Sequence, residues 1–300
     1  MTDQKKAYLF AILAILFWST IATAFKLTLE HIFFLPALFY ASAVSTFIYL
    51  IILLSQNKFG QLTRLNKSAV LQGSFRGFLN PFLYYLVLLK AYSLLKAQEA
   101  GTLNYIWPIT LVLLSIPLLK QKISWVSILA VFISFFGIVV ISSEGRVMDL
   151  SFREPFGVIL AVGSSVFWAL YWILNVKDKT DEVIKMFLNF SFGTIYIFIA
   201  ILLFSDFSPV SVKGLLGSLY IGIFEMGITY FLWLMAMKNS ENTAKIGNLV
   251  YLSPFISLII IHFVLNEKIL LSTFIGLVFI VSGIIIQYIE GKKKKRLSSS

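Results

Sequence analysis

The sequence has no cysteine and few charged residues among its 300 positions. Without cysteine there are no disulfides and no cysteine-ligated metal sites, and the redox environment cannot be inferred. Charged residues make up 13% of the chain, whereas soluble domains average roughly 25%. Hydrophobic residues make up 59%, which is more apolar surface than a water-soluble fold can bury. The composition therefore predicts a protein that is embedded in lipid.

The sequence also lacks the motifs of common enzymes and pumps. It contains no phosphate-binding loop, no HExxH and no GxSxG. Its two histidines, His31 and His262, are isolated and have no nearby carboxylate cluster, so they do not predict a metal site. We therefore expect no enzyme activity and no cofactor, and we expect any energy source to be an ion or substrate gradient.

Long apolar runs account for most of the chain. Each is close to the roughly 20 residues that a helix needs to cross about 30 Å of hydrocarbon, and the connections between them are short. Strands of a membrane barrel would instead be about ten residues long with alternating polarity. The sequence thus predicts an all-α integral membrane protein with ten transmembrane helices. The ten segments are 7–27, 32–55, 68–92, 98–118, 123–143, 157–176, 183–204, 213–237, 242–264 and 270–289.

The distribution of lysine and arginine predicts the orientation. With the N-terminus inside, 17 of the 25 basic residues fall on the inner side, which agrees with the positive-inside rule. Both termini are then cytoplasmic. The basic tail, residues 291–300, has a charge pattern that also occurs in nucleic-acid-binding segments. Next to a membrane helix, we interpret it as an anchor attracted to anionic lipid, and we expect no nucleic-acid partner.

The two halves of the chain resemble each other. Gly101, Tyr105 and Pro108 recur 146 residues later as Gly247, Tyr251 and Pro254. An offset of 145 pairs further residues: Gly77 with Gly222, Asn80 with Glu225, Tyr85 with Tyr230 and Ala91 with Ala236. Such a collinear set indicates duplication. We predict one five-helix repeat in residues 1–147 and a second in residues 148–290.

An odd number of spans per repeat has a consequence for topology. The second copy must enter the membrane from the opposite side, so the repeats are inverted and related by a pseudo-two-fold axis in the membrane plane. Two such halves can exchange conformations of similar energy, one open to each side. Transporters of this kind bind substrate near the midplane, between the repeats. The chain is therefore predicted to carry a small molecule across the membrane.

Polar residues inside the spans are candidates for the substrate path, because they are costly in lipid. Arg76, Asn80 and Tyr84 are spaced four apart and predict one polar helix face. Glu225 lies near the middle of its span and could bind a substrate ammonium, carry a proton, or serve as a hydrogen-bonded structural residue. Arg76 could extend to the inner headgroups, pair with Glu225, or bind an anionic substrate group.

The segments that begin at Gly101 and Gly247 predict two equivalent bent helices. Pro108 and Pro254 each remove a backbone donor and bend the helix, and the glycines allow close approach of a neighbouring helix. We assign these four residues to packing and gating. Asn104, Tyr105 and Trp107 are candidate substrate contacts, with Tyr251 as the equivalent of Tyr105; the alternative is that the aromatic residues only pack around the bend.

Tryptophan occurs at equivalent places in the first and sixth segments, as Trp18 and Trp168. Both lie away from the membrane surfaces, so we expect them to line the cavity and to contact a ring, an aliphatic group or a quaternary ammonium. The fifth and tenth segments carry Gly137, Gly276 and Gly283 and few polar residues. They are predicted to be packing helices, with a homodimer contact as a possibility.

Ten spans in two inverted halves, with LFWST and VFWAL in equivalent spans, resemble the EamA branch of the drug/metabolite transporter superfamily. GTLNYIWP is similar to a motif of bacterial aromatic amino acid exporters, and the resemblance covers nearly the whole chain. It implies export of amino acids and related metabolites through a central cavity, in the bacterial cytoplasmic membrane. Alternatives are a transporter of the same fold for a drug cation or sugar derivative, and a membrane enzyme or scaffold.

Overall fold

The computed structural model describes residues 3–119, 124–147, 154–205, 210–239 and 249–298, and these residues form helices and connecting loops with no strand. The helices of the first half are α1 (Asp3–Leu29), α2 (Phe34–Ser55), α3 (Phe59–Leu62), α4 (Lys67–Gly77), η1 (Phe78–Leu83), α5 (Tyr84–Leu94), α6 (Ala97–Asn104), α7 (Trp107–Leu119) and α8 (Trp125–Ser142). Those of the second half are α9 (Pro155–Lys177), α10 (Glu182–Phe204), α11 (Val212–Ile221), η2 (Gly222–Gly227), α12 (Ile228–Lys238), η3 (Val250–Leu252), α14 (Ser253–Leu265) and α15 (Leu271–Ser298).

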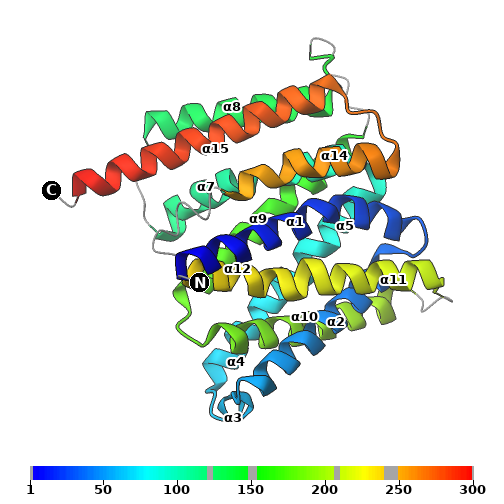
Figure 1. Ribbon diagram of the computed structural model, residues 1–300, viewed down its shortest axis with the longest axis vertical. Coiled ribbons are helices and arrows are strands. Elements are labelled where there is room, and N and C mark those ends of the chain that lie inside the picture. Colours follow the sequence, from blue (N-terminus) through cyan, green and yellow to red (C-terminus); the bar gives the residue numbers. More distant parts are fainter. Residues whose placement is uncertain (1–2, 120–123, 148–153, 206–209, 240–248, 299–300) are drawn as a thin grey trace.

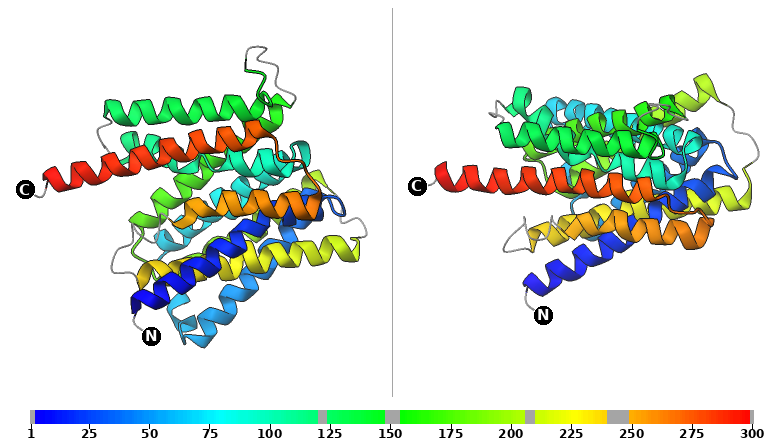
Figure 2. Two further views of the ribbon diagram at one scale, coloured as in Figure 1. Left: turned by 45° about the horizontal axis from the view of Figure 1, so that its top comes forward. Right: turned by 90° about the horizontal axis from the view of Figure 1, so that it is seen from above.

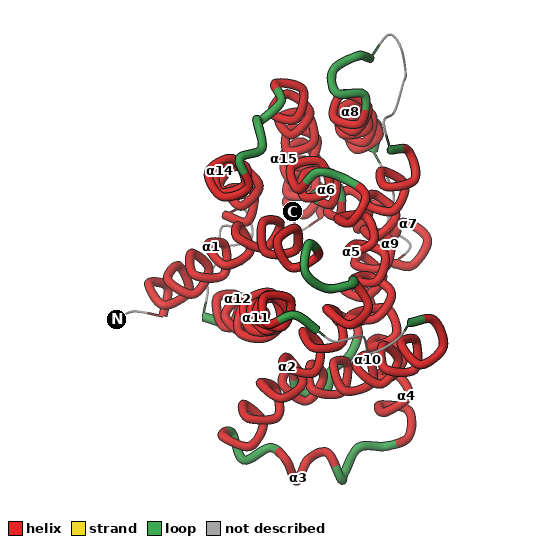
Figure 3. The backbone as a smooth tube through the Cα atoms, turned by 90° about the vertical axis from the view of Figure 1, so that its right-hand side faces the viewer, coloured by secondary structure: helices red, strands yellow, loops and turns green. Residues whose placement is uncertain are grey.

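The long helices run roughly parallel to one another, as Figures 1 and 2 show. The start of α1 and the end of α15 lie at the same end of this bundle, which we call the terminal end, and the opposite end is the far end. Viewed along the helices in Figure 3, α8 and α15 form one edge of the bundle, while α2, α4 and α10 form the opposite edge.

The lengths of the helices and the apolar outer surface of the bundle both fit a membrane environment. Six helices among the described residues are long and apolar enough to cross a membrane, and two shorter apolar helices, Ile128–Ile141 and Ser253–Leu265, accompany them. Large apolar side chains such as Phe47, Phe132 and Phe204 are 60%, 66% and 78% exposed on the outside of the bundle. Water would make this surface unfavourable, so the surroundings of the bundle are lipid.

Helix is present in each of the ten segments predicted from the sequence, but four of the segments are irregular. The third and the eighth each contain a π-helical segment, η1 and η2, at nearly equivalent positions of the two halves. The fourth is interrupted between α6 and α7, and the ninth contains the 3₁₀ turn η3 directly before α14. π-Helical insertions are rare and often mark functional sites.

Helices at equivalent positions of the predicted repeat pack against corresponding partners. In the first half, α1 packs against α12 and α14; in the second, the equivalent α9 packs against α5 and α7. Helix α8 packs along α15, and Ser134 Oγ donates a hydrogen bond to the Ile280 carbonyl 3.3 Å away. A side chain at Gly137 would collide with the backbone of Gly276, so these glycines allow the two helices to touch.

Candidate functional site

A cavity lies in the middle of the bundle and extends toward its far end. The helices around it come from both halves of the chain. Its residues on α1 run from Trp18 to Phe25 and those on α5 from Tyr84 to Tyr92, which is from mid-depth toward the far end. Polar and aromatic side chains among the lining residues are Trp18, Phe25, Tyr84, Tyr92, Gln98, Thr102, Asn104, Tyr105, Trp107, Trp168, Glu225 and Ser257.

Most of the candidate residues from the sequence meet at this cavity. The lining includes seven of the proposed substrate contacts and two of the proposed gating residues: Trp18, Tyr84, Asn104, Tyr105, Trp107, Trp168 and Glu225, with Gly101 and Pro254. Arg76 and Asn80 are buried elsewhere and do not line it. Gly247 lies outside the described residues, as do the side chains of Pro108 and Tyr251.

Glu225 is the acidic residue of the cavity wall. It lies in η2, is 7% exposed, and accepts a hydrogen bond through Oε1 from the Tyr85 hydroxyl at 2.9 Å. The Tyr85 hydroxyl is also 3.1 Å from that of Tyr230. Within the described residues, Glu225 Oε2 has no hydrogen-bond partner. One carboxylate oxygen is thus held by the protein and the other is free to accept a bond from a ligand.

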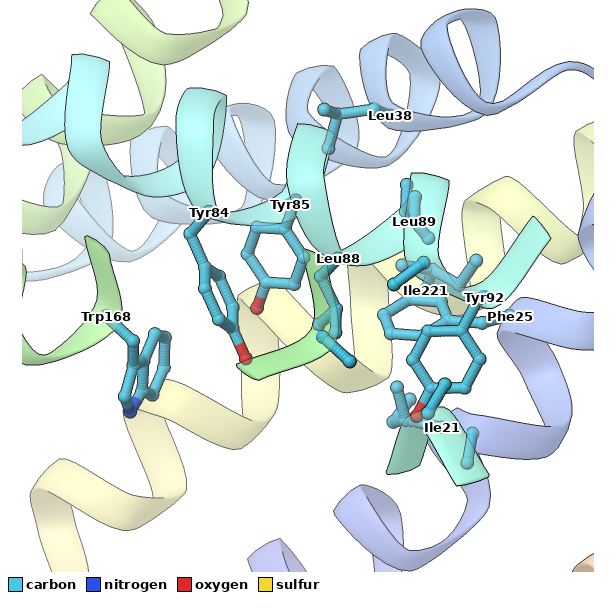
Figure 4. Packing of buried hydrophobic residues seen from close by; sticks show 14 of the residues in the cluster. Ile21, Phe25, Leu38, Tyr84, Tyr85, Leu88, Leu89, Tyr92, Trp168 and Ile221 are labelled. Atoms are coloured by element: carbon cyan, nitrogen blue, oxygen red, sulfur yellow. The ribbon is translucent and has the colours of Figure 1, made fainter. Parts of the chain in front are cut away.

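Aromatic rings form the rest of the wall at the depth of Glu225. The ring centroids of Tyr84 and Trp168 are 4.7 Å apart, and Trp107 meets Trp168 edge-on at 6.3 Å. Figure 4 shows Tyr84 beside Tyr85 on α5, with Trp168 facing Tyr84 from α9. Trp18 packs against Tyr230 with centroids 6.3 Å apart. These flat surfaces suit a ring or an aliphatic chain, and their faces attract cations.

Asn104 connects three helices at the cavity. Its Nδ2 donates to the Tyr84 hydroxyl at 3.1 Å, and its Oδ1 accepts from Ser164 Oγ at 3.1 Å. The side chain therefore ties the end of α6 to α5 and α9. This arrangement fixes the position of the Tyr84 ring in the cavity wall, and it occupies one donor and one acceptor of the amide.

The helix that carries Asn104 is broken next to it. Helix α6 ends at Asn104, α7 begins at Trp107, and Pro108 falls in the first turn of α7, where its missing N–H costs nothing. On the other side of the cavity, Pro254 lies in the first turn of α14. Gly101 lies in tight packing: a Cβ atom added there would lie 3.1 Å from the Tyr92 hydroxyl and 3.4 Å from the Cβ of Ala22, so a larger residue would have to displace a neighbour.

The polar stripe expected from Arg76, Asn80 and Tyr84 is not formed. The π-helical turn η1 lies between the first and the last of these residues, and Asn80 has extended backbone angles (φ −151°, ψ 121°). An irregular turn changes the rotation of the helix, so residues four apart no longer share a face. Tyr84 consequently faces the cavity, while Arg76 and Asn80 point toward α9 and α10.

Arg76 forms an ion pair, but with Asp178 and not with Glu225. The guanidinium Nη2 lies 2.6 Å from Asp178 Oδ2, and the two side chains are 3% and 10% exposed. Asp178 follows α9, in the loop that connects it to α10 at the terminal end. In the same loop, Asp181 Oδ2 lies 2.6 Å from Lys58 Nζ. Two ion pairs thus join the first half of the chain to the second at the terminal end of the bundle.

Both loop aspartates are held in the ionised form. Partial burial alone would raise the pKa of Asp178, but hydrogen bonds from Thr180 and the charges of Arg76 and Lys185 outweigh burial and lower it. The same holds for Asp181, where burial is outweighed by Lys58 and by the backbone N–H groups of Val183 and Ile184, so its pKa is also lowered. Asp181 additionally caps the N-terminus of α10 through those two N–H groups.

Two features of the site were not predicted from the sequence. The first is the contact of the Tyr85 hydroxyl with Glu225 and with Tyr230. The repeat offset pairs Tyr85 with Tyr230, but it does not by itself predict that these side chains touch. Residues that contact their own repeat equivalent are expected near the predicted pseudo-two-fold axis, so the pairing of Tyr85 with Tyr230 is a sequence signal for this place in the fold. The second is Asp178, which lies just past the end of a predicted span. Its distance from Arg76 along the chain left no local signal for the pair.

Among the described residues, no cluster of acidic or histidine side chains could hold a metal ion.

Comparison with known proteins places the fold among transporters. Residues 5–143 and 155–289 each match the model of the EamA-like transporter family. An uncharacterized transporter of Clostridium kluyveri is 30% identical over 187 residues, which is 60% of this chain and 60% of that protein's own length. The uncharacterized transporter YvbV of Bacillus subtilis is 24% identical over 72% of this chain and 71% of its own. A solved crystal structure with a TM-score of 0.67 and 20% identity covers 96% of this chain and 98% of its own, and shows the same fold.

The matches to the family model together span nearly the whole chain, on both sides of the boundary between its halves. The two relatives are themselves named as transporters, and this group consists of carriers and not of enzymes. A cavity between the halves, inside a helical bundle with an apolar exterior, fits that grouping. By its sequence, the chain belongs to the EamA-like transporter family.

Proposed function

We propose that the protein exports amino acids with aromatic or neutral side chains, and related small metabolites, through its central cavity. The observation that carries this proposal is the chemistry of the cavity wall. One carboxylate, with an oxygen free to accept a bond, lies among the rings of Trp18, Tyr84 and Trp168. A substrate ammonium would bind Glu225, and an apolar side chain would pack on the rings.

The carboxylate of such a substrate also has a candidate donor. Within the described residues, the indole Nε1 of Trp168 is buried and has no hydrogen-bond partner. It belongs to the same wall as Glu225. An amino acid carries its ammonium and its carboxylate on the same carbon atom, and a wall with one free acceptor and one free donor matches both groups.

Alternating access is the proposed mechanism. The two matches to one family model, the packing of equivalent helices and the contact of Tyr85 with Tyr230 support two inverted halves. We place ten spans in the bacterial inner membrane, with both termini in the cytoplasm, so that the cavity faces outward. The ion pairs of Asp178 and Asp181 would then close the cytoplasmic side. Export requires that these contacts open while the far end closes.

A homodimer through α8 and α15 remains a prediction.

An organic cation is the second candidate substrate. Among the described lining residues, Glu225 is the charged one, and no lysine, arginine or histidine accompanies it. Arg76 pairs with Asp178 and does not line the cavity, so it supplies no cation there for a substrate carboxylate. A negative, aromatic cavity suits a cation that carries a flat or bulky apolar group.

A counterflow screen with purified protein in liposomes separates the candidates. Liposomes loaded with one unlabelled compound are tested for uptake of its labelled form, with phenylalanine, leucine, phenylethylamine and a quaternary ammonium compound as the first set. Counterflow of amino acids supports the proposal. Counterflow of the amine and the quaternary compound without the amino acids would overturn it in favour of cation transport. Wild-type liposomes that exchange none of these compounds would contradict both.

A further inference from the structure

A second group of buried polar side chains lies on the terminal side of the cavity. We call it the terminal cluster: Arg76, Asn80, Tyr171, Asn175 and Asn189, which are between 0% and 5% exposed. Arg76 comes from α4 and Asn80 from η1, in the first half of the chain, while the other three come from α9 and α10 in the second half. Like the cavity, the cluster is therefore built between the two repeats.

Hydrogen bonds link part of the cluster. Arg76 Nε donates to Asn189 Oδ1 at 3.4 Å, and Asn189 Nδ2 donates to the Tyr171 hydroxyl at 3.3 Å. These distances are longer than the usual 2.9–3.0 Å, so the bonds are weak. Asp178 neutralises the Arg76 guanidinium from the edge of the cluster. The cluster is therefore polar, and its one cation, the Arg76 guanidinium, is already paired with the Asp178 carboxylate.

Among the other side-chain atoms of the cluster, Asn175 Nδ2 donates to the Tyr171 carbonyl at 2.8 Å, and three polar atoms of Asn80 and Asn175 have no partner within the described residues. Neither Oδ1 nor Nδ2 of Asn80 has a hydrogen-bond partner within the described residues, although the side chain is 0% exposed. Asn175 Oδ1 and the Nε1 of the adjacent Trp172 are likewise unpartnered. Burying such groups without partners is unfavourable, so a state of the protein in which they are satisfied is expected.

The repeat indicates what that state is. Asn80 is the equivalent of Glu225, and each lies in a π-helical segment. Glu225 lines the cavity that extends to the far end, whereas Asn80 is enclosed. When inverted halves exchange their conformations, equivalent residues exchange their surroundings. Asn80 would then line a cavity that opens at the terminal end, and Glu225 would be enclosed.

From these observations, we propose that the terminal cluster is a cytoplasmic loading site for a substrate that carries a carboxylate. The site is closed in this conformation by Asp178. On opening, the substrate carboxylate takes the place of Asp178 at Arg76, in a charge-assisted contact of the same kind, and the Asn80 amide donates a further bond. The Arg76 charge is thereby compensated in both states. This inference rests on the proposed export of amino acids from the cytoplasm.

Cysteine accessibility tests the site, because the native chain has no cysteine. Single variants Asn80→Cys and Asn189→Cys are placed in inside-out membrane vesicles, whose cytoplasmic face is outside, and treated with a membrane-impermeant maleimide. Both cysteines should react from the cytoplasmic face at least 10-fold faster than Ala91→Cys, a control at a residue that is 0% exposed in the apolar core. Ser257→Cys, on the cavity wall, should react preferentially from the outer face in right-side-out vesicles.

Substrate protection then tests the ligand class. Phenylalanine should slow the labelling of Asn80→Cys from the cytoplasmic face, and phenylethylamine, which lacks the carboxylate, should need at least a 5-fold higher concentration for the same protection. No cytoplasmic labelling of either variant overturns the site as a whole. Labelling without protection overturns a binding role, and equal protection by both compounds overturns the carboxylate assignment. If wild-type liposomes exchange no amino acid while Asn80→Cys is labelled, the proposed export fails separately from the access path.

Discussion

The hydroxyl groups of Tyr85 and Tyr230 lie 3.1 Å apart, and the two residues are equivalents of each other in the predicted repeat. Ser134 and Ile280, which are also one repeat apart, touch in the same way. A residue contacts its own equivalent only near a two-fold axis. Two such contacts, one between α5 and α12 and one between α8 and α15, support an axis that passes through both places. Tyr85 also donates to Glu225, so the carboxylate proposed to bind a substrate ammonium lies beside that axis.

Removing each tyrosine hydroxyl should have unequal effects. Tyr85→Phe deletes the donor to Glu225 Oε1, whereas Tyr230→Phe deletes only the bond between the two tyrosines. A hydrogen bond to a charged group contributes about 1.5–3 kcal/mol. We therefore expect Tyr85→Phe to reduce the transport rate about 10-fold or more, and Tyr230→Phe to reduce it less than about 3-fold. Initial rates in proteoliposomes measure the difference, and equal losses would show that the Tyr85–Glu225 bond has no special role.

Glu225→Gln should impair transport more than folding. The variant keeps an acceptor for Tyr85 and nearly the same volume, but it removes the negative charge that attracts a substrate ammonium. We expect transport to fall at least about 10-fold while thermal stability in detergent changes little, since a buried amide costs less than a buried carboxylate. Glu30→Gln, at an exposed residue outside the helices, is the matched control and should transport normally. Normal export by Glu225→Gln, with or without a pH gradient, would exclude a role for its charge.

Asn104→Ala and Trp107→Ala test the cavity wall on the broken helix. Loss of the Asn104 amide releases the Tyr84 hydroxyl and Ser164 together, and loss of Trp107 removes a ring that packs on Trp168. Both variants should weaken substrate affinity, by about 5-fold or more, as measured by the half-saturation concentration in counterflow. Ser164→Ala, which keeps the bond from Asn104 to Tyr84, should change affinity less. If both wall variants bind substrate normally, this part of α6 and α7 is structural.

The repeated motifs in the sequence predicted the residues of the cavity better than the spacing expected for a regular helix did. The apolar segments located the helices because lipid requires long apolar runs, and the repeated motifs selected residues such as Trp18, Asn104 and Glu225 that meet at the cavity. The spacing of Arg76, Asn80 and Tyr84 failed because it assumed a regular helix. In the third segment, Pro81 is a local signal against a regular helix, because it removes a backbone donor, and it packs against Gly193. The eighth segment contains no proline, so its π-helical turn has no such local signal.

The ion pair of Arg76 with Asp178 should make the stability of the folded protein fall at low pH. The pKa of Asp178 is lower in the folded protein than its ordinary value of 3.8, so its stabilising contribution is complete above that value and is lost as the pH falls through the lowered pKa. Asp181, whose pKa is also lowered, acts in the same direction. The melting temperature in detergent should thus be nearly constant from about pH 7 to 5 and fall below about pH 4.

Variants at this pair separate its charge from its other contacts. Asp178→Asn leaves the buried Arg76 guanidinium without its carboxylate and should cost about 3 kcal/mol at pH 7, because an unpaired buried charge is more costly than the loss of the pair. Adding Arg76→Gln removes that charge, so the double variant should recover part of the loss. Its melting temperature should also fall less than that of the wild type below pH 4. A double variant that is less stable than Asp178→Asn alone would show that Arg76 is stabilised mainly by Asn189 and its other neighbours, and that the ion pair does not hold the terminal end together.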